Sequence, residues 1–451
     1  MQSRVILVNF EYPPIAGPGI WRVFALSRDL SSLGFDVEVV CSDRSSWHTL
    51  TDATLLNRIP DSVHVHRISA PFVADWKARL ATRQQDSRNP LARAVWRRAE
   101  QLLARYAPDP VFAWVPRAAR VIRQLARAGT GPVTIISSGP THLSHIAALV
   151  ARDRRITSWI MDYRDLWSSD PTLVYPGPYQ LRLFRMLERF CLRACDAVVS
   201  VTPSWLQDIA VVAGNDPAVT AKLRVIRNGH DLTAQRLAGL QMENRTSERL
   251  HLHFSGTLQS GTRESAIALL EALARLRERH RDLALPRVTF TGLHRRVADA
   301  VQRLQLEDVV EDVGYRNQDD ALRLSAAADV LLVLVDAAGS GRRGVVPAKT
   351  YECIALGRHV LAIVPPGSDV ETLLTEYGAA SVCGEEPESI SVALEKLLLQ
   401  HAREPGSLRI QPGRNEAARE SYSRQAAAAD FARLLDSLNI TGEPSSSTQA
   451  R

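Results

Sequence analysis

The chain opens with a short apolar run of strand length, a turn rich in glycine and proline, and then a helical pattern. Residues 4–10 form the run, which ends in Glu11-Tyr-Pro-Pro and a loop that contains Gly17 and Gly19. Apolar residues at helical spacing follow over 23–33, Gly34 stops them, and a second run occupies 37–40. Strand–helix–strand units of this kind build parallel sheets. The pattern therefore predicts an α/β fold.

The unit recurs in two series that meet near residues 232–248. Further runs lie at 133–136, 158–161, 197–201 and 223–226, and then at 251–254, 288–291, 310–314, 330–335, 361–364 and 380–383. A chain of 451 residues has room for two or three domains. We predict two doubly wound, Rossmann-like domains (1–235 and 236–412), a helix crossing back to the first domain (413–438) and a disordered tail (439–451). Because such sheets bind ligands at the carboxyl ends of their strands, a ligand is expected in a cleft between the domains.

The positive charge of the chain is concentrated in one stretch. Residues 77–127 hold twelve Lys or Arg against three Asp or Glu, while the whole chain has a net charge of only +6. A local basic surface suits phosphate groups, anionic lipid or nucleic acid. Within it, helical spacing over 91–106 aligns four apolar residues along one stripe: Leu91, Val95, Leu102 and Tyr106. The stripe can pack on the domain's own sheet or face a membrane.

The sequence argues against several classes of protein and of site. No apolar run approaches the length of a membrane span, and the first run is too short for a signal peptide, which predicts a cytoplasmic protein. The basic stretch leaves open peripheral contact with the inner face of the cell membrane. No nucleic-acid module accompanies it, so no nucleic-acid partner is expected. The five cysteines show no pattern typical of a zinc site, and no metal is expected. Cys191 and Cys195 are four residues apart on a probable helix, which favours buried thiols over metal ligands.

Four segments, in order, point to one family. Besides the loop with Gly17 and Gly19, they are Asp162-Tyr-Arg-Asp-Leu-Trp, Asn228-Gly-His-Asp and the block from Pro347 to Ala362. They resemble the acceptor-side loop, the DxRDxW segment, the IPNGVD segment and the PxKxYEYxAxGxPVLA donor block of family 4 glycosyltransferases with the GT-B fold. The DxRDxW segment is similar to that of a bacterial subgroup that makes surface polysaccharides. The resemblance implies that 1–235 is the acceptor side and 236–412 the donor side.

The resemblance also implies a donor site in the second domain. Glu352 would accept hydrogen bonds from ribose hydroxyls, and Arg263 and Lys349 would contact the leaving diphosphate. Strand-to-helix turns present backbone N–H groups to phosphate, which nominates the turns at Gly256 and at Gly344, Val345 and Val346. The turns at Gly292 and Tyr315 would flank the base. As isolated residues, Arg263 and Lys349 could equally be solvated surface charges.

One position departs from the family pattern. The donor signature often has two glutamates separated by seven residues, and counting back from Glu352 places the first at Gly344. Glycine has no side chain to meet the sugar, so Asp336, Arg342 and Arg343 become alternative candidates. The departure leaves open a degenerate, inactive protein.

Three residues of the first domain are candidates because they follow strands. His142 lies in the turn after 133–136, and Arg164 and Asp165 follow 158–161. Each could orient the acceptor or the transferred sugar, or it could be structural. We assign no general base.

The sequence thus predicts a retaining, metal-independent glycosyltransferase that moves a sugar from a nucleotide-diphosphate donor to a glycan acceptor, which can be lipid-linked, in surface-polysaccharide biosynthesis. The nucleotide sugar is a substrate, and no cofactor is expected. The alternatives are a non-catalytic GT-B protein that binds a nucleotide or a partner, and a GT-B sugar-nucleotide epimerase.

Overall fold

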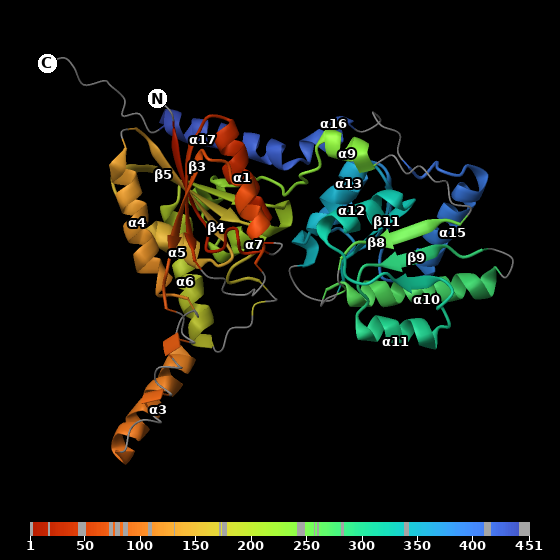
Figure 1. Ribbon diagram of the computed structural model, residues 1–451, viewed down its shortest axis with the longest axis horizontal. Helices are drawn as coiled ribbons and strands as arrows, with labels where there is room; N and C mark the ends of the chain where they lie inside the picture. Colours follow the sequence, from red (N-terminus) through yellow and green to blue (C-terminus); the bar gives the residue numbers. More distant parts are fainter. Residues whose placement is uncertain are drawn as a thin grey trace. The chain divides into compact units, whose positions relative to one another are not determined.

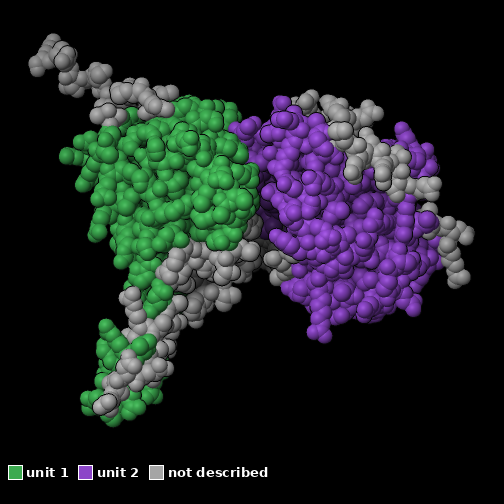
Figure 2. Space-filling model, viewed as in Figure 1, with its two compact units in different colours: residues 1–201, 205–227, 427–451 green, residues 202–204, 228–426 purple. Residues whose placement is uncertain are grey.

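The computed structural model describes residues 3–16, 19–43, 51–71, 75–76, 82–83, 89–106, 111–129, 131–170, 173, 178–240, 249–256, 258, 261–280, 284–337, 342–409 and 416–441. The chain forms two compact units (Figure 2). Unit 1 comprises residues 1–201, 205–227 and 427–451, and unit 2 comprises 202–204 and 228–426. Each unit is an α/β domain with its own sheet and core.

Unit 1 is built on a parallel sheet whose described strands run in the order β3-β2-β1-β4-β5-β6-β7. Their bounds are Arg4–Val8 (β1), Asp36–Ser42 (β2), Val63–Ile68 (β3), Val133–Gly139 (β4), Ile156–Tyr163 (β5), Ala197–Ser200 (β6) and Leu223–Val225 (β7). In the central strand β1, Val5, Ile6, Leu7 and Val8 are at most 1% exposed. Such a continuous apolar strand is expected where helices cover both faces of a parallel sheet.

Helices lie on both faces of this sheet, and Figure 1 shows α1 on one side of the strands and α4 on the other. The described helices are α1 (Trp21–Ser32), η1 (Ala53–Arg58), α3 (Pro90–Tyr106), α4 (Trp114–Ala128), α5 (Leu143–Ala151), α6 (Pro178–Ala194), α7 (Pro203–Val212) and α8 (Pro217–Thr220). Helix α1 ends before Gly34, whose φ of +93° is one that glycine adopts without strain.

The last helix, α17 (Arg424–Thr441), completes the core of unit 1. Ala428, Phe431 and Leu435 are each 1% exposed and belong to the same apolar cluster as Phe24 and Leu30 of α1. Helix α17 therefore packs in the same core as Val5 and Leu7 of β1, more than 400 positions earlier in the chain.

Unit 2 has a second parallel sheet, in which the described strands follow the order β10-β9-β8-β11-β12-β13. These are His251–Phe254 (β8), Arg287–Phe290 (β9), Val310–Asp312 (β10), Val330–Leu334 (β11), His359–Ile363 (β12) and Ala380–Cys383 (β13). The helices are α9 (Ala234–Leu240), α10 (Arg263–Arg279), α11 (Arg295–Arg303), α12 (Gln318–Ala327), η2 (Arg342–Gly344), α13 (Ala348–Leu356), α14 (Asp369–Tyr377), α15 (Pro387–Arg403) and α16 (Glu416–Ser421).

Successive residues of β11 show how the sheet of unit 2 separates two cores. Leu332 and Leu334 belong to the cluster formed with α10, α11 and α15, whereas Leu331 and Val333 belong to the cluster formed with α12, α13 and α14. Side chains of a strand alternate between the two faces of its sheet. Both faces of β11 are apolar because both are covered.

Both sheets reverse their strand order at one point, between β1 and β4 in unit 1 and between β8 and β11 in unit 2. In open parallel sheets a ligand crevice forms at the carboxyl ends of the two strands that flank such a reversal. The loops that follow β1, β4, β8 and β11 are therefore the places to look for functional residues.

The predicted α/β class and the twelve predicted strands are confirmed, and the sequence analysis missed one strand, β3. The sequence of β3 is VHVHRI, and it pairs only with β2 at the edge of the described sheet. Polar residues are tolerated on an edge strand, so the apolar signal was weak. All five cysteines are free and buried, which confirms the prediction made for Cys191 and Cys195. The tail beyond 441 lies outside the described residues.

The stripe predicted along 91–106 does not pack on the sheet at its described end. Leu91 is 77% exposed and Val95 is 61% exposed on α3. The side chains of Leu102 and Tyr106 lie outside the described part of the chain. Among the described helices, none is both long enough and apolar enough to cross a membrane.

Candidate functional site

A buried ion pair lies at the carboxyl end of β5 in unit 1. Arg22, on the first turn of α1, donates from Nη2 to Asp162 Oδ1 at 2.8 Å and from Nε to Oδ2 at 3.0 Å. Ser138 Oγ donates to the same Oδ2 at 2.8 Å. Arg22 also donates to the carbonyls of Ile226 and Arg227, each at 3.0 Å. The pair therefore joins α1, β4, β5 and the segment that follows β7.

Arg164 and Gly19 of the predicted site meet in the structure. The Arg164 guanidinium donates to the Gly19 carbonyl and lies 3.3 Å from Asp165 Oδ2. A Cβ added to Gly19 would lie 2.8 Å from both terminal nitrogens of Arg164, so a larger residue at this position would require the guanidinium to shift. Arg164 thus holds the loop after β1, and Asp165, with a side chain 44% exposed, lies beside it. Gly17 lies outside the described residues.

His142 is buried at the start of α5, in a stack of aromatic rings. Its ring lies 5.2 Å from that of Trp167, tilted by only 12°. Nε2 lies 3.0 Å from the carbonyl oxygen of Leu166, which can only accept, so Nε2 carries the proton. Burial, followed by the nearby His145, lowers the pKa of His142 well below its usual value. His142 is therefore a neutral imidazole whose Nδ1 is an acceptor.

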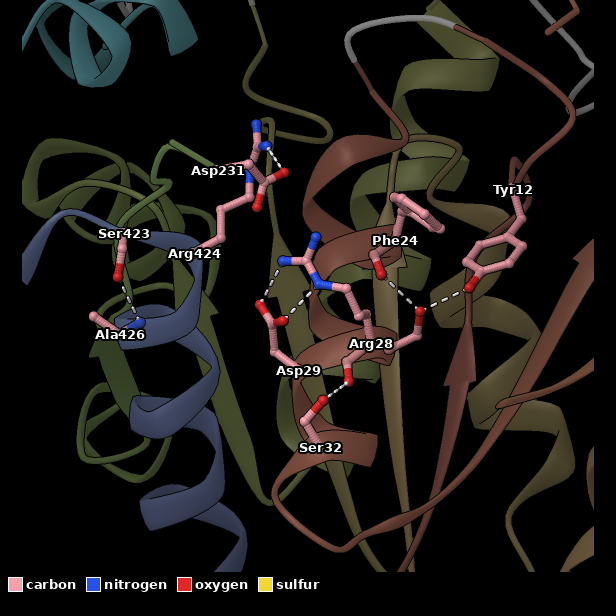
Figure 3. Close-up of polar contacts among 10 residues, drawn as sticks. Tyr12, Phe24, Arg28, Asp29, Ser32, Asp231, Ser423, Arg424 and Ala426 are labelled. Atoms are coloured by element: carbon pink, nitrogen blue, oxygen red, sulfur yellow. Dashed lines mark hydrogen bonds and ion pairs between the residues drawn. The ribbon is translucent and has the colours of Figure 1, made fainter. Parts of the chain in front are cut away.

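The loop after β1 is anchored through Tyr12, which is buried (Figure 3). Ser27 Oγ donates to the Phe24 carbonyl at 2.7 Å, so it accepts from the Tyr12 hydroxyl, also at 2.7 Å. Burial raises the pKa of Tyr12 to about 12, which keeps the phenol protonated. On the same helix, Arg28 pairs with Asp29 at 2.7 Å.

In unit 2, the turns after β8 and β9 are joined. The Gly256 amide donates to Thr291 Oγ1 at 2.6 Å, and the Leu258 amide donates to the Gly292 carbonyl at 3.4 Å. Gly256 and Gly292 have φ angles of +142° and +153°. Two of the predicted donor-site turns are therefore adjacent, and the Gly256 amide is engaged by Thr291 rather than directed at open solvent.

Arg263 is the first residue of α10 and faces His294. Its Nη1 lies 3.4 Å from His294 Nε2. Because His294 Nδ1 accepts from the Arg296 amide, a neutral ring carries its proton on Nε2, so the 3.4 Å approach is not a hydrogen bond. The same first turn of α10 is fixed by Asp336, which follows β11 and accepts from the amide and hydroxyl of Ser265, each at 3.0 Å. Asp336 therefore caps α10.

The predicted diphosphate cation and the predicted ribose acceptor pair with each other. Lys349 Nζ lies 2.9 Å from Glu352 Oε2, one turn apart at the start of α13. Their side chains are 40% and 19% exposed, so both are partly accessible. Pro347 starts the helix and Gly357 ends it with φ +65°. Since α13 follows β11, the pair lies at the end of the sheet where the strand order reverses.

The remaining donor-side candidates differ in exposure. Gly344 ends the short helix η2 and is buried, and Val345 and Val346 pack partly against the core on the α13 face. Tyr315 follows β10 and Gly314, and it is 81% exposed. Within the described part of the chain, no group of His, Cys, Asp and Glu is placed to hold a metal ion.

The Asn228-Gly-His-Asp segment lies beside the segment that leads into α17. The backbones of His230 and Ser423 form an isolated parallel β-bridge. Asp231 forms an ion pair with Arg424 (Figure 3). A Cβ on Gly229 would lie 2.6 Å from the Tyr422 carbonyl oxygen, so the segment needs glycine there.

Sequence reasoning missed several partners of these residues. Arg22 and Asp162 are 140 positions apart, and Thr291 and His294 approach Gly256 and Arg263 from a different turn. No local pattern links such residues. For Asp162 the sequence did contain a signal, because this residue opens the DxRDxW segment directly after the predicted strand 158–161.

Comparison with known proteins agrees with this geometry. Residues 19–229 match the model of the glycosyl transferase 4-like domain. No curated protein matches the chain in sequence.

Solved structures similar to this chain cover nearly its whole length. Sucrose-phosphate synthase from Thermosynechococcus elongatus is 15% identical with a TM-score of 0.60, covering 98% of this chain and 100% of its own. Anabaena HepE in complex with UDP-glucose is 13% identical with a TM-score of 0.56, covering 96% and 99%. A UDP-N-acetylglucosamine 2-epimerase, described as putative, from Listeria monocytogenes is 13% identical with a TM-score of 0.51, covering 97% and 96%. The chain has the GT-B fold.

Proposed function

We propose that this protein is a retaining, metal-independent glycosyltransferase that transfers a sugar from a nucleotide-diphosphate donor to a lipid-linked glycan at the inner face of the cell membrane, in surface-polysaccharide biosynthesis. The family of residues 19–229 supports sugar transfer. The observation that carries the donor assignment is the Lys349–Glu352 pair at the strand-order reversal of unit 2. HepE, solved with UDP-glucose, makes a UDP-sugar the first donor to test.

The Lys349–Glu352 pair can contact both the diphosphate and the ribose of the donor. The Lys349 ammonium has three donor hydrogens, so it can keep its contact with Glu352 and also bind a phosphate oxygen. Glu352 Oε1 then accepts from a ribose hydroxyl, with the carboxylate oriented by Lys349 through Oε2. Negative charge grows on the diphosphate as the glycosidic bond breaks, so a cation held there stabilises the transition state more than the ground state.

Binding of UDP, GDP and ADP and of their sugars to the purified protein tests the donor assignment. A ligand at 100 times its dissociation constant stabilises the folded state by about 2.7 kcal/mol, which thermal denaturation detects readily. Glu352→Ala should weaken the best nucleotide about ten- to a hundredfold, since a hydrogen bond to a charged group is worth roughly 1.5–3 kcal/mol. Glu388→Ala is the control, because it also removes an arginine-paired carboxylate of unit 2, that of the Arg279 pair. Equal dissociation constants for the two variants would contradict the role of Glu352.

Two alternatives are separated by the reaction itself. Because an epimerase has this fold as well, the fold does not exclude a sugar-nucleotide epimerase. An epimerase would change the donor sugar without any acceptor, whereas a transferase needs an acceptor or water. Gly344, in place of a signature glutamate, motivates a non-catalytic protein, which would bind a nucleotide but release none from its sugar. NMR analysis of the anomeric carbon in the product tests retention.

The membrane part of the proposal rests on α3. Its described side chains include exposed Leu91 and Val95 together with exposed Arg93, Arg97 and Arg98. Apolar and basic residues on one helix suit an anionic lipid surface, with roughly 1 kcal/mol gained for each Lys or Arg near it. Changing the three arginines to glutamate should abolish co-sedimentation with anionic vesicles at low salt. Binding that is indifferent to the change and to salt would favour an acceptor in solution.

A further inference from the structure

Helix α6 of unit 1 presents a second apolar surface to solvent. Tyr179 is 53% exposed, Met186 is 48% exposed and Phe190 is 53% exposed. Their spacing of seven and four residues places them on one face of the helix. The opposite face is buried through Phe184, Glu188 and other residues. The helix is labelled in Figure 1. Three large apolar side chains half exposed on one helical face are more than scattered surface residues.

The rest of the exposed surface of α6 is basic. Arg182, Arg185, Arg189 and Arg193 are all exposed. The helix has one acidic residue, Glu188, and its side chain is buried, accepting from the Tyr163 hydroxyl and the Ser168 amide, each at 3.0 Å. Helix α6 itself therefore offers arginines to solvent and no carboxylate, and one carboxylate of a neighbouring segment, Asp216, lies 3.8 Å from Arg193 Nε.

The apolar surface continues onto the end of α7. Arg189 Nε donates to the Val212 carbonyl at 2.7 Å, which fixes the end of α7 beside α6. Val211, the adjacent residue, is 65% exposed. The surface formed by Tyr179, Met186, Phe190 and Val211 is called the α6 face below.

We propose that the α6 face docks on an anionic lipid membrane, as a second contact surface of unit 1 besides α3. This inference rests on the membrane acceptor of the proposed function. The positive charge of α6 indicates which partner the α6 face can bind. A second copy of the chain that used the same face would bring arginines opposite arginines, which is unfavourable. Anionic headgroups instead complement the arginines, while the apolar side chains enter the boundary between headgroups and acyl chains.

The first experiment compares vesicle binding of full-length variants. The vesicles contain equal parts of phosphatidylglycerol and phosphatidylcholine, or phosphatidylcholine alone. The partition coefficient of a Met186→Ser/Phe190→Ser variant should fall at least tenfold on the anionic vesicles, and Arg182→Gln/Arg185→Gln should lower it about fivefold for each arginine removed. All four changes are at exposed positions.

A matched control lies on α15 of unit 2, which has the same length of 17 residues. Val392 and Leu399 are 39% and 43% exposed there, so Val392→Ser/Leu399→Ser removes a similar exposed apolar area. This variant should bind vesicles like the unaltered protein. Equal losses for the α6 and α15 variants would overturn the α6 assignment.

The α3 charge variant separates this inference from the proposed function. If the α3 variant loses binding and the α6 variants keep it, the membrane role of α3 stands and the α6 inference is wrong. If the α6 variants lose binding and the α3 variant keeps it, the α6 inference stands. If the α6 variants change only the sedimentation velocity of the protein without lipid, the face joins copies of the chain and the inference is wrong.

A fluorescent label gives a direct readout. The five native cysteines are buried, so a Met186→Cys variant can be labelled selectively with an environment-sensitive dye. Its emission should shift to shorter wavelength with anionic vesicles and not with phosphatidylcholine alone. The same dye on a Val392→Cys variant should show no shift. Equal shifts at both positions, or none at Met186→Cys, would overturn the inference.

Discussion

Replacing Asp162 with asparagine removes the counter-charge of Arg22 while nearly keeping the shape of the side chain. The two side chains are 0% and 6% exposed, and Arg22 would be left as a buried cation. Breaking a buried ion pair from one side costs about 3–5 kcal/mol. A domain of this size has a total stability of about 5–15 kcal/mol, and each kcal/mol lost lowers Tm by about 2–4 °C. We therefore expect Asp162→Asn to lower the Tm of unit 1 by about 6–20 °C.

Tryptophan fluorescence reports this loss specifically. All eight tryptophans lie between residues 21 and 205, in unit 1, so urea unfolding followed by their emission monitors that unit alone. Asp153→Asn makes the same change in the Arg127–Asp153 pair, where the arginine side chain is 63% exposed, and it should leave the midpoint nearly unchanged. A double variant, Arg22→Met/Asp162→Leu, should recover part of the stability because it leaves no unpaired charge. Equal midpoints for Asp162→Asn and Asp153→Asn would refute the reasoning.

Three further outcomes are expected. Arg263→Ala should reduce turnover at saturating donor by about a hundredfold with a smaller effect on donor affinity, since loss of one transition-state contact costs on the order of 3 kcal/mol; near-normal turnover in a steady-state assay would remove it from the leaving group. Tyr315→Ala should weaken nucleotide binding in calorimetry and leave Tm unchanged, because the side chain is 81% exposed; an unaltered affinity would place the base elsewhere. Burial lowers the pKa of His145 to about 3, so the unfolded state takes up the proton first, and stability falls as pH drops below about 6.5. Between pH 6.5 and 5 this amounts to about 2 kcal/mol, and urea midpoints of a His145→Phe variant should lack that part of the decline.

The sequence predicted those features of the fold that are local. Apolar runs such as 133–136 and 330–335 became strands because a fully buried parallel strand needs an uninterrupted apolar sequence. Strand β3 was not predicted because its histidines, which are compatible with an edge position, weaken the apolar pattern. On α3, the spacing of Leu91 and Val95 indicated an apolar face but not what covers it. Periodicity specifies a face, whereas its neighbour depends on the tertiary structure.

The sequence predicted which residues belong to the candidate site, but it did not predict which distant residues contact them. Motif order nominated Lys349 and Glu352, and a separation of three residues on a helix makes their contact foreseeable. The contact of Arg164 with Gly19 joins residues 145 positions apart, and spacing along the chain contains no information about it. Such contacts arise because parallel strands bring the ends of distant segments to one edge of the sheet.

The position of α17 means that the core of unit 1 can be completed only late in the synthesis of the protein. Ala428, Phe431 and Leu435 fill the core of unit 1, yet they leave the ribosome after all of unit 2. Domains that are contiguous in sequence can fold as soon as they emerge, N-terminal domain first. Here the first sheet has to wait, with the apolar surface around Phe24 and Leu30 uncovered, until the rest of the chain has been made. Any shortened version that stops before residue 428 would keep that surface open permanently, and it would be prone to aggregate even though its own strands are complete.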